Sequence, residues 1–267
     1  MNFKPLVWDD LEKIRFLQPD DWPDIIIDFK IYLHYDFCWP IKLISDKQII
    51  GVGAAIAFKN TGWLAHIIVD SNYRNRGLGG KITGELKRIL AAQGLSNLLL
   101  LASELGKPVY LRAGFRVVGE YLYMQRKSDP KPFITSKSII PFNQKYRSSV
   151  LELDRAITGE NRTELLLSKI NSSHLYIKGE ELMGFYIPEL CEGPIIAQDD
   201  TAGIELMKVK YASAEKAVLP LDNKAGKDFL INNGFSDTGK KGTRMILGEE
   251  VNWQPEKIFS RIGGNFG

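Results

Sequence analysis

The stretch Ile67-Ile68-Val69-Asp70-Ser71-Asn72-Tyr73-Arg74-Asn75-Arg76-Gly77-Leu78-Gly79-Gly80-Lys81 decides the fold of the first half of this 267-residue chain. An apolar strand is predicted to end at Val69, and a polar loop with three glycines then leads into an amphipathic helix. Glycines let the backbone approach a ligand closely, and the amide N–H groups then point at one spot beside the positive end of a helix dipole. The stretch therefore predicts an anion site suited to a pyrophosphate.

Other phosphate-binding motifs fit this stretch less well. A P-loop requires GxxxxGK[ST], but Gly80-Lys81 is followed by Ile82, and Asn75 stands where the first glycine is needed. A dinucleotide fingerprint requires GxGxxG, whereas the order here is GxGG. The remaining alternative is that the glycines only form a tight turn.

Around this stretch, the first half of the chain alternates between segments typical of strands and of helices. A polar turn over residues 46–48 indicates a hairpin, and Gly94 and Gly114 are typical helix stops. We expect strands over residues 3–7, 41–45, 49–58, 63–69, 98–101 and 116–126, and helices over 20–35, 79–93 and 107–113.

The second half repeats this arrangement. Tyr110-Leu-Arg-Ala-Gly-Phe115 is paralleled by Phe229-Leu-Ile-Asn-Asn-Gly-Phe235. An apolar strand precedes each segment, and a strand with a methionine follows it. Such a repeat indicates two copies of one domain type, joined by a polar linker with two prolines. We expect helices over residues 151–157, 162–170, 201–212 and 223–233, and strands over 174–177, 182–187, 193–197 and 217–221.

Composition limits the class of protein. Hydrophobic residues make up 44% of the chain, charged residues 25%, and the formal net charge is +3. These values are ordinary for a soluble globular protein, and the charge is too small to favour nucleic acid or an anionic membrane as the main partner. The two cysteines, Cys38 and Cys191, indicate neither a disulfide framework nor zinc, and we expect both to be buried free thiols.

We expect neither a targeting segment nor a membrane segment in this sequence. Its start is acidic and lacks the basic and apolar regions of a signal peptide. The longest apolar stretch, residues 49–58, is far shorter than the roughly 20 residues that a membrane span needs. We therefore expect a cytoplasmic protein.

The glycine-rich stretch resembles a known family. Arg74-Asn-Arg-Gly77-Leu-Gly79 matches the R/Q-x-x-G-x-G/A motif of the GNAT superfamily of N-acetyltransferases. Residues 101–115 resemble the later motif of that family, in a Gly-x-Pro-x-Tyr form typical of a bacterial two-domain branch. Segments of the second half also resemble this branch, namely Asp154-Arg155, Gly193-Pro-Ile-Ile-Ala-Gln-Asp199, Asp222-Asn223, Thr243-Arg244-Met245 and residues 259–267.

The resemblance implies an α/β fold in which a mixed, largely antiparallel sheet is flanked by helices, present as a tandem GNAT pair. Residues 1–128 are then the catalytic domain, 129–140 a linker, and 141–267 a degenerate GNAT-like domain that walls the acceptor pocket. The implied co-substrate is acetyl-CoA, with no metal.

The resemblance also implies which residues bind the cofactor. The pantetheine arm would run beside the strand that ends at Val69, and the pyrophosphate would lie on the amides from Arg74 through Lys81. Lys81, Lys87 and Arg88 are candidates for the 3′-phosphate. The full cofactor-binding set is Ile67, Ile68, Val69, Arg74, Asn75, Arg76, Gly77, Leu78, Gly79, Gly80 and Lys81.

Two residues are candidates for catalysis. Tyr110 matches the tyrosine assigned as general acid in the family, and a phenol can donate to the leaving sulfur without first being ionised. His66 lies three residues before the end of the strand, and its ordinary pKa suits a base or a relay through water. Glu104 is a second candidate base. The alternatives are packing roles for Tyr110 and His66 and a solvated carboxylate for Glu104.

The second half is predicted to lack a cofactor site. The step from Ala197 to Ala217 is shorter than the corresponding step from Val69 to Leu98, and the missing residues correspond to the glycine loop. Asp199 and Asp200 are expected to cap a helix there, and two carboxylates repel a pyrophosphate. Asp222 is expected either in the wall of the acceptor pocket or as a helix cap.

These observations predict an acetyl-CoA-dependent N-acetyltransferase that acts on the primary amine of a small molecule. The expected partner is that amine, without nucleic acid or membrane, and the chain is expected to be a monomer or a homodimer. Two other functions remain open, a non-catalytic acyl-CoA sensor and an aminoacyl transferase that uses tRNA.

Overall fold

The structure, a computed structural model, describes residues 1–20, 22–129 and 132–267. The predicted helix 20–35 and the predicted linker 129–140 each include residues outside this described part. The chain divides into two compact units. The first unit comprises residues 1–117, 245–250 and 266, and the second comprises 118–244, 251–265 and 267. Each unit is described separately below.

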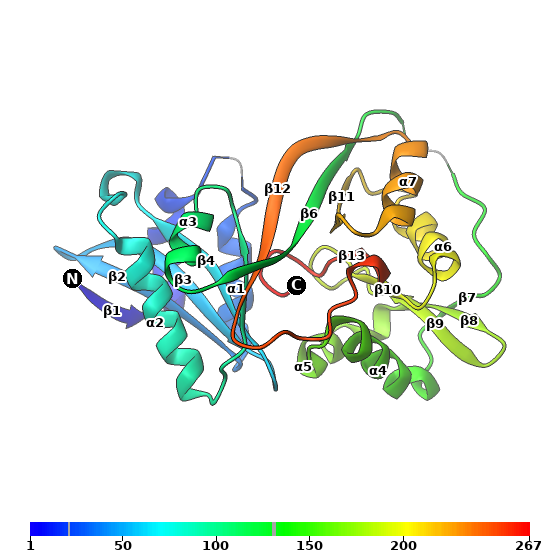
Figure 1. Ribbon diagram of the computed structural model, residues 1–267, viewed down its shortest axis with the longest axis horizontal. Coiled ribbons are helices and arrows are strands. Elements are labelled where there is room, and N and C mark those ends of the chain that lie inside the picture. Colours follow the sequence, from blue (N-terminus) through cyan, green and yellow to red (C-terminus); the bar gives the residue numbers. More distant parts are fainter. Residues whose placement is uncertain (21, 130–131) are drawn as a thin grey trace. The chain divides into compact units, whose positions relative to one another are not determined.

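The first unit is an α/β sandwich built on one sheet (Figure 1). Its strands run in the hydrogen-bonded order β1-β2-β3-β4-β5, followed by the end of β12. Strands β1 to β4 pair antiparallel, and β4 pairs with β5 in parallel. Its elements are β1 (Asn2–Pro5), α1 (Ile25–His34), β2 (Cys38–Ser45), β3 (Gln48–Ala57), β4 (Gly62–Val69), α2 (Leu78–Ala92), β5 (Leu98–Ala102), α3 (Lys107–Arg112), and the adjoining parts of β6 (Arg116–Arg126) and β12 (Phe235–Leu247).

Helix α2 packs closely on the sheet because β3 carries small residues beneath it (Figure 1). A Cβ atom at Gly53 would lie 2.9 Å from Ile82 Cγ2 and 3.0 Å from Leu86 Cδ1. Ile82 and Leu86 are fully buried and form the apolar stripe that the sequence predicts. The close approach fixes the start of α2 relative to the strands, and the start of α2 is where the glycine loop lies.

Helix α1 is shorter than predicted, since the prediction of a helix from residue 20 was wrong. It begins at Ile25, after Asp24 accepts a hydrogen bond from the N–H of Ile26 at 3.0 Å. Gln18 accepts from the N–H of Ile25 at 2.9 Å and donates to the carbonyls of Trp22 and Pro23. These bonds hold Trp22 and Pro23 outside the helix, and Pro23 cannot donate a backbone hydrogen bond. Trp22 therefore lies outside the helix.

The second unit contains two sets of strands. In one, β6 lies between β12 and β11 and pairs with β11 antiparallel. In the other, the order is β13-β10-β9-β8-β7, also antiparallel. Helices α6 and α4 pack against β9 and β10. Besides β6 and β12, the unit contains β7 (Ile139–Pro141), α4 (Arg147–Thr158), α5 (Thr163–Leu167), β8 (His174–Lys178), β9 (Glu181–Tyr186), β10 (Ile195–Ala197), α6 (Asp200–Lys210), β11 (Lys216–Pro220), α7 (Lys224–Asn232) and β13 (Ile258–Ser260).

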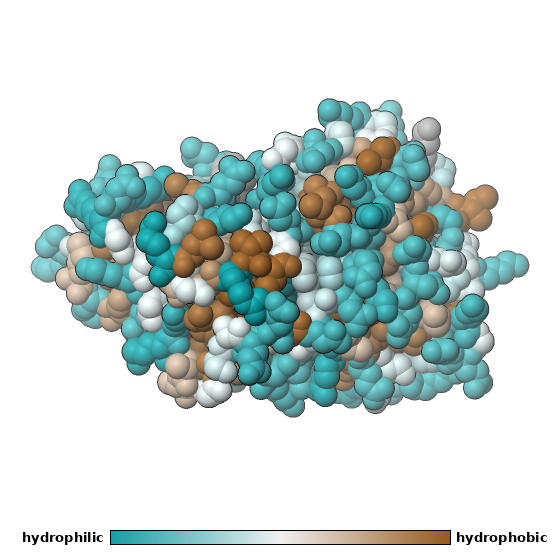
Figure 2. Space-filling view, viewed as in Figure 1, coloured by the Kyte–Doolittle hydropathy of each residue, from teal (hydrophilic) through white to brown (hydrophobic). Residues whose placement is uncertain are grey.

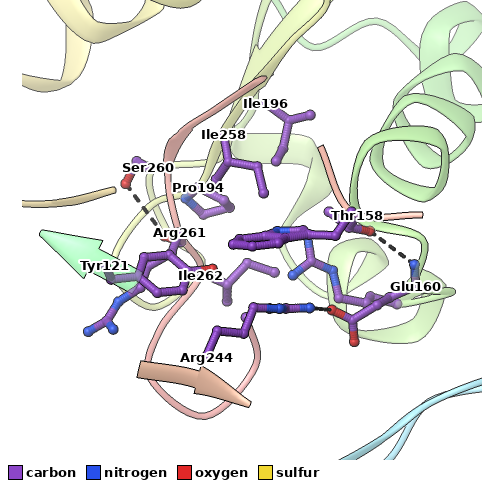
Figure 3. A pocket seen from close by; sticks show the side chains of 13 residues that line it. Tyr121, Thr158, Glu160, Pro194, Ile196, Arg244, Ile258, Ser260, Arg261 and Ile262 are labelled. Atoms are coloured by element: carbon purple, nitrogen blue, oxygen red, sulfur yellow. Dashed lines mark hydrogen bonds and ion pairs between the residues drawn. The ribbon is translucent and has the colours of Figure 1, made fainter. Parts of the chain in front are cut away.

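Buried ion pairs occur in the second unit (Figure 3). Arg162 pairs with Asp154 at 2.6 Å, and Arg244 pairs with Glu160 at 2.9 Å. Glu160, Arg162 and Arg244 border a cavity of about 10 Å³, which also contacts Tyr121 and Trp253. A volume of that order holds about one water molecule.

The predicted fold class is confirmed, because both units combine largely antiparallel sheets with flanking helices. Within the described residues, no helix is long and apolar enough to cross a membrane.

Candidate functional site

The glycine-rich stretch forms the expected strand, loop and helix start in the first unit. Strand β4 ends at Val69, a short 3₁₀ turn covers Ser71–Tyr73, and α2 begins at Leu78. Gly77 stands before the helix with φ of 73°, and Asn75 adopts φ of 61°. Both angles lie in the left-handed region, which a glycine adopts without steric penalty. These two residues let the chain change direction sharply just before α2 begins.

Among the described residues, no side chain caps the first backbone N–H groups of α2, whereas an aspartate caps α1 and another caps α6. The N–H of Lys81 donates to the carbonyl of Gly77 at 3.1 Å and is therefore occupied. The N–H groups of Leu78, Gly79 and Gly80 belong to the unpaired first turn of the helix. An anion at this point would complete the helix.

The loop also leaves room for a ligand. A Cβ atom placed at Gly77 or at Gly80 would meet no heavy atom within 4 Å. At Gly79, the nearest atom is Val109 Cγ1, 3.9 Å away. The backbone is therefore open on the side of the helix start, and the residues present fit a pyrophosphate.

Basic side chains near the loop divide into two groups. Arg74 donates from Nε to the carbonyl of Val69 at 3.2 Å, and Arg76 donates to the carbonyl of Asn72 at 3.1 Å, so both hold the loop. Lys87 donates to the carbonyl of Ala113 at 3.1 Å, and Arg88 pairs with Glu85 at 2.7 Å. Lys81 is exposed beside the helix start.

Strands β4 and β5 pair only at their beginnings. In the parallel register, Gly62 pairs with Leu98 and Trp63 pairs with Leu99. Among the described residues, β4 and β5 form no further pair. On its other side, β4 pairs with β3 as far as Val69. The backbone of β4 from Leu64 to Val69 therefore keeps one edge outside the ladder. Ile67 and Val69 are half-buried there, and the side chain of Ile68 is buried.

Tyr110 lies in α3, in the same core cluster as Leu78 at the start of α2. Its ring meets Phe115 edge to face, with the ring centroids 6.2 Å apart. Burial raises the pKa of Tyr110 well above its ordinary value, so the phenol stays protonated near neutral pH. The helix that carries Tyr110 and the start of α2 thus share one core.

The surface around α3 is partly apolar. Leu105, Leu111 and Val117 expose 75%, 49% and 43% of their area. Figure 2 shows hydrophobic side chains gathered over α3 and the start of β6. Of these residues, Leu111 belongs to α3, and Leu105 and Val117 flank that helix.

His66 lies at an irregularity of β4. The register between β3 and β4 shifts between Val52 and Ala54, and His66 adopts φ of 48°, unusual for a residue other than glycine. Its Nδ1 lies 2.6 Å from the hydroxyl of Tyr32, and its Nε2 lies 3.4 Å from Asp28 Oδ2. The ring is thus held between two side chains of helix α1.

Sequence reasoning missed Asp28 and Tyr32. They stand four residues apart on α1, which contains no recognisable motif, and only the fold brings them to His66. The available signal was their i, i+4 spacing, which places both on one helix face. Glu104, the second candidate base, is exposed on the loop before α3.

The two cysteines differ in their surroundings. Cys38 is buried, and burial raises the pKa of its thiol far above the ordinary value. Cys191 is exposed, so the prediction that both thiols are buried was wrong for this residue. It lies in a tight turn with φ of 49°, which keeps it at the surface.

The second unit has a helix cap where the first unit has the glycine loop. Asp199 accepts a hydrogen bond from the N–H of Ala202 at 2.8 Å and caps α6 as predicted. Asp200 stands in the first turn of the same helix. Asn223, and not Asp222, caps α7, since its side chain accepts from the N–H of Gly226 at 2.7 Å. The start of α6 is therefore acidic and already capped.

Two models of GNAT acetyltransferase domains match the chain, one over residues 41–126 and the other over residues 150–260. The protein belongs to the GNAT acetyltransferases and contains two such domains in tandem. It is therefore an enzyme of the acyltransferase class. Comparison with curated proteins gives no match.

Solved structures support the fold. A putative acetyltransferase from Pyrococcus horikoshii is similar with a TM-score of 0.82 at 18% identity, over 100% of this chain and 95% of that chain. A GCN5-related N-acetyltransferase from Anabaena variabilis is similar with a TM-score of 0.57 at 11% identity, over 92% of this chain and 72% of that chain. A probable N-acyltransferase from Enterococcus faecalis is similar with a TM-score of 0.56 at 14% identity, over 96% of this chain and 73% of that chain.

Proposed function

We propose that this protein is an acetyl-CoA-dependent N-acetyltransferase that transfers an acetyl group to the primary amine of a small molecule in the cytoplasm. The uncapped, open start of α2 carries this proposal. A helix that begins with free N–H groups behind a left-handed glycine attracts an anion, and Gly77 to Gly80 leave that position clear. The pyrophosphate of acetyl-CoA supplies that anion, and its thioester supplies the acetyl group.

The open edge of β4 supports the position of the pantetheine arm. An amide-bearing arm needs backbone partners, and the β4 edge beyond Trp63 offers them because β5 no longer pairs there. We infer that Ile67, Ile68 and Val69 line this arm. Lys81 is the best placed of the basic candidates for the 3′-phosphate, because Lys87 and Arg88 are already engaged.

Two side chains would move protons in this reaction. A new amide bond requires a neutral attacking amine and a protonated leaving thiolate. Tyr110 donates its phenolic proton to the leaving sulfur, since a phenol carries its proton at neutral pH. His66 removes a proton from the amine. The second unit takes no acetyl-CoA, because Asp199 already caps the corresponding helix and Asp200 adds negative charge.

Calorimetry with acetyl-CoA tests the proposal on the purified protein. The Gly77→Glu variant places a carboxylate in the anion position and strains a left-handed residue, so we expect it to abolish detectable binding. Gly84→Glu is the matched control, because Gly84 is exposed in the same helix and a Cβ there meets no atom within 4 Å. Equal binding by the two variants would exclude the proposed pyrophosphate site.

Release of free thiol from acetyl-CoA in a broad panel of amines then identifies the acceptor. Binding of acetyl-CoA without thiol release for any amine would indicate the sensor function. Retention of charged tRNA on a filter would indicate the aminoacyl transferase function.

A further inference from the structure

The central strands of the two units have different neighbours. In the first unit, β4 keeps one edge outside the ladder from Leu64 onward, where the proposed pantetheine arm lies. The elements β3, β4, α2, β5 and α3 of the first unit follow the same order as β9, β10, α6, β11 and α7 of the second unit. Strands β10 and β11 are therefore the counterparts of β4 and β5. The edge of β10 is paired, because β13 lies along it.

Strand β13 lies between β10 and β11 (Figure 1). It pairs antiparallel with β10 through Ile258 and Ser260. On its other side it contacts β11, and the N–H of Arg261, just after the strand, donates to the carbonyl of Val218 at 3.3 Å. In the strand orders, β13 and β11 are each the last strand of their set. Strand β13 thus fills the gap between two sheet edges.

Side chains of the second unit hold β13 in this gap. Phe259 is fully buried, and its ring packs on α6 where Gly203 has no side chain. A Cβ atom at Gly203 would lie 2.2 Å from Phe259 Cε2, too close for any side chain. The carbonyl of Ile258 accepts from Asn223 Nδ2 at 3.0 Å, and Ser260 Oγ accepts from Lys210 Nζ at 2.6 Å. The strand is bound through its backbone and its side chains, as a docked peptide is.

Little space remains beside the strand. The cavity of about 10 Å³ is bordered by Ile196 of β10 and by Ile258 and Ser260 of β13. It has room for about one water molecule, far less than an extended chain with amide groups requires. A ligand can therefore use this gap only when β13 leaves it.

We propose that β13 is a strap, built into the chain, that occupies a pantetheine groove of the second unit and closes it. The inference rests on the proposed position of the pantetheine arm beside β4, and it goes beyond the proposed function because it assigns a sealed groove of the same class to the second unit. A strand and a pantetheine arm both offer amide N–H and C=O groups to a sheet edge. When β13 is displaced, the backbone of β10 loses its partner, and pantetheine replaces it.

Two substitutions displace the strap. In Gly203→Ala, the added methyl group collides with the buried ring of Phe259, although alanine itself favours a helix. Phe259→Ala is the second variant, since it removes the ring and leaves α6 unchanged. In both variants, we expect the amides of residues 258–262 to exchange with solvent at least about tenfold faster than in the wild-type protein. Hydrogen-exchange NMR measures these rates, and β8 and β9 should keep their protection.

Pantetheine, which lacks the pyrophosphate of acetyl-CoA, then probes the groove itself. A reductant is included, because Cys191 is exposed. In the wild-type protein, we expect pantetheine to shift the amide signals of β4 and to leave those of β10 unchanged. In Gly203→Ala and Phe259→Ala, the amide signals of β10 should shift as well. Gly84→Ala is the matched control, since Gly84 is an exposed helix glycine with open space around it, and it should respond as the wild-type protein does.

Each other outcome would overturn the proposal. Shifts of the β10 amides in the wild-type protein would show that the groove is open beside β13. A variant with rapid exchange over residues 258–262 and no β10 response to pantetheine would show that the gap is no pantetheine groove. Wild-type exchange rates in both variants would show that the contact of Phe259 with Gly203 does not hold the strand. Loss of protection throughout β8 and β9 in both variants would make β13 part of the core and not a displaceable strap.

The β4 amides separate this test from that of the proposed function. Absence of their response to pantetheine would contradict the proposed arm position in the first unit, whereas the β10 amides report on the second unit alone. Calorimetry with acetyl-CoA should still give one equivalent per chain in Gly203→Ala and Phe259→Ala, because Asp199 and Asp200 remain at the start of α6.

Discussion

At the scale of single residues, the proposed role of Tyr110 as a proton donor leads to a direct prediction. Replacing Tyr110 by Phe keeps the edge-to-face contact with Phe115 and removes only the hydroxyl. With an amine that supports thiol release, we expect kcat to fall about 100-fold, in the range of general acid catalysis, while the KM for acetyl-CoA stays the same. Steady-state kinetics measure both constants.

Tyr35→Phe is the control for this change, because Tyr35 stacks on Phe37 and lies outside the glycine loop. Its kcat should match that of the wild-type protein. An unchanged kcat in Tyr110→Phe would mean that Tyr110 packs against other groups and donates no proton.

Asp10 provides a pH-dependent test at the residue scale. Burial acts to raise its pKa, but the hydrogen bonds from Lys42 and from the N–H of Val7 outweigh it and lower the pKa below the ordinary value. A lowered pKa in the folded state stabilises the protein above the unfolded-state pKa of about 4, and this stability is lost as the pH falls through the folded-state value.

We therefore expect Asp10→Asn to lower the free energy of unfolding by about 1–3 kcal/mol at pH 7, because Lys42 loses its buried partner. The difference from the wild-type protein should shrink below about pH 4. Urea unfolding at both pH values measures it, with the exposed Asp9→Asn as control. A difference that stays constant down to pH 2 would contradict this assignment.

At the scale of elements, the sequence predicted best where local signals agree. The extent of β6 was predicted to the residue, and the hairpin turn at Asp46 and Lys47 follows from polar residues that adopt positive φ. Helix α1 was predicted less well, because the cap by Asp24 and the bonds from Gln18 override an apolar period that begins earlier. Side-chain hydrogen bonds of this kind leave no periodic trace in the sequence.

The candidate site shows the same division between local and non-local information. The glycine loop is one contiguous stretch, so its open helix start could be predicted from residues 67–81 alone. The contacts of Asp28 and Tyr32 with His66 join α1 to β4 across intervening strands, and no short motif encodes them. The irregular register of β4 that turns His66 toward α1 was likewise beyond prediction, because it depends on pairing with β3.

At the scale of the whole molecule, segments distant in the sequence complete each compact unit. Residues 245–250 and 266 belong to the first unit, although they lie near the end of the chain. Met245 is fully buried in the core that contains Leu98 and Leu100, and Phe266 meets Tyr32 with centroids 6.0 Å apart. The repeat in the sequence indicates two domains of one type, but this assignment of distant segments depends on tertiary packing.

The two domains of this chain are alike in fold and differ at the helix that follows the central strand, and the difference predicts a binding stoichiometry. In the first unit, α2 begins with a left-handed glycine and uncapped N–H groups. In the second unit, Asp199 occupies the equivalent donors of α6, and Asp200 adds negative charge. We therefore expect calorimetry to give one acetyl-CoA per chain. Two equivalents, or one that survives Gly77→Glu, would place a cofactor site in the second unit, and Asp199→Lys would then be expected to alter its affinity.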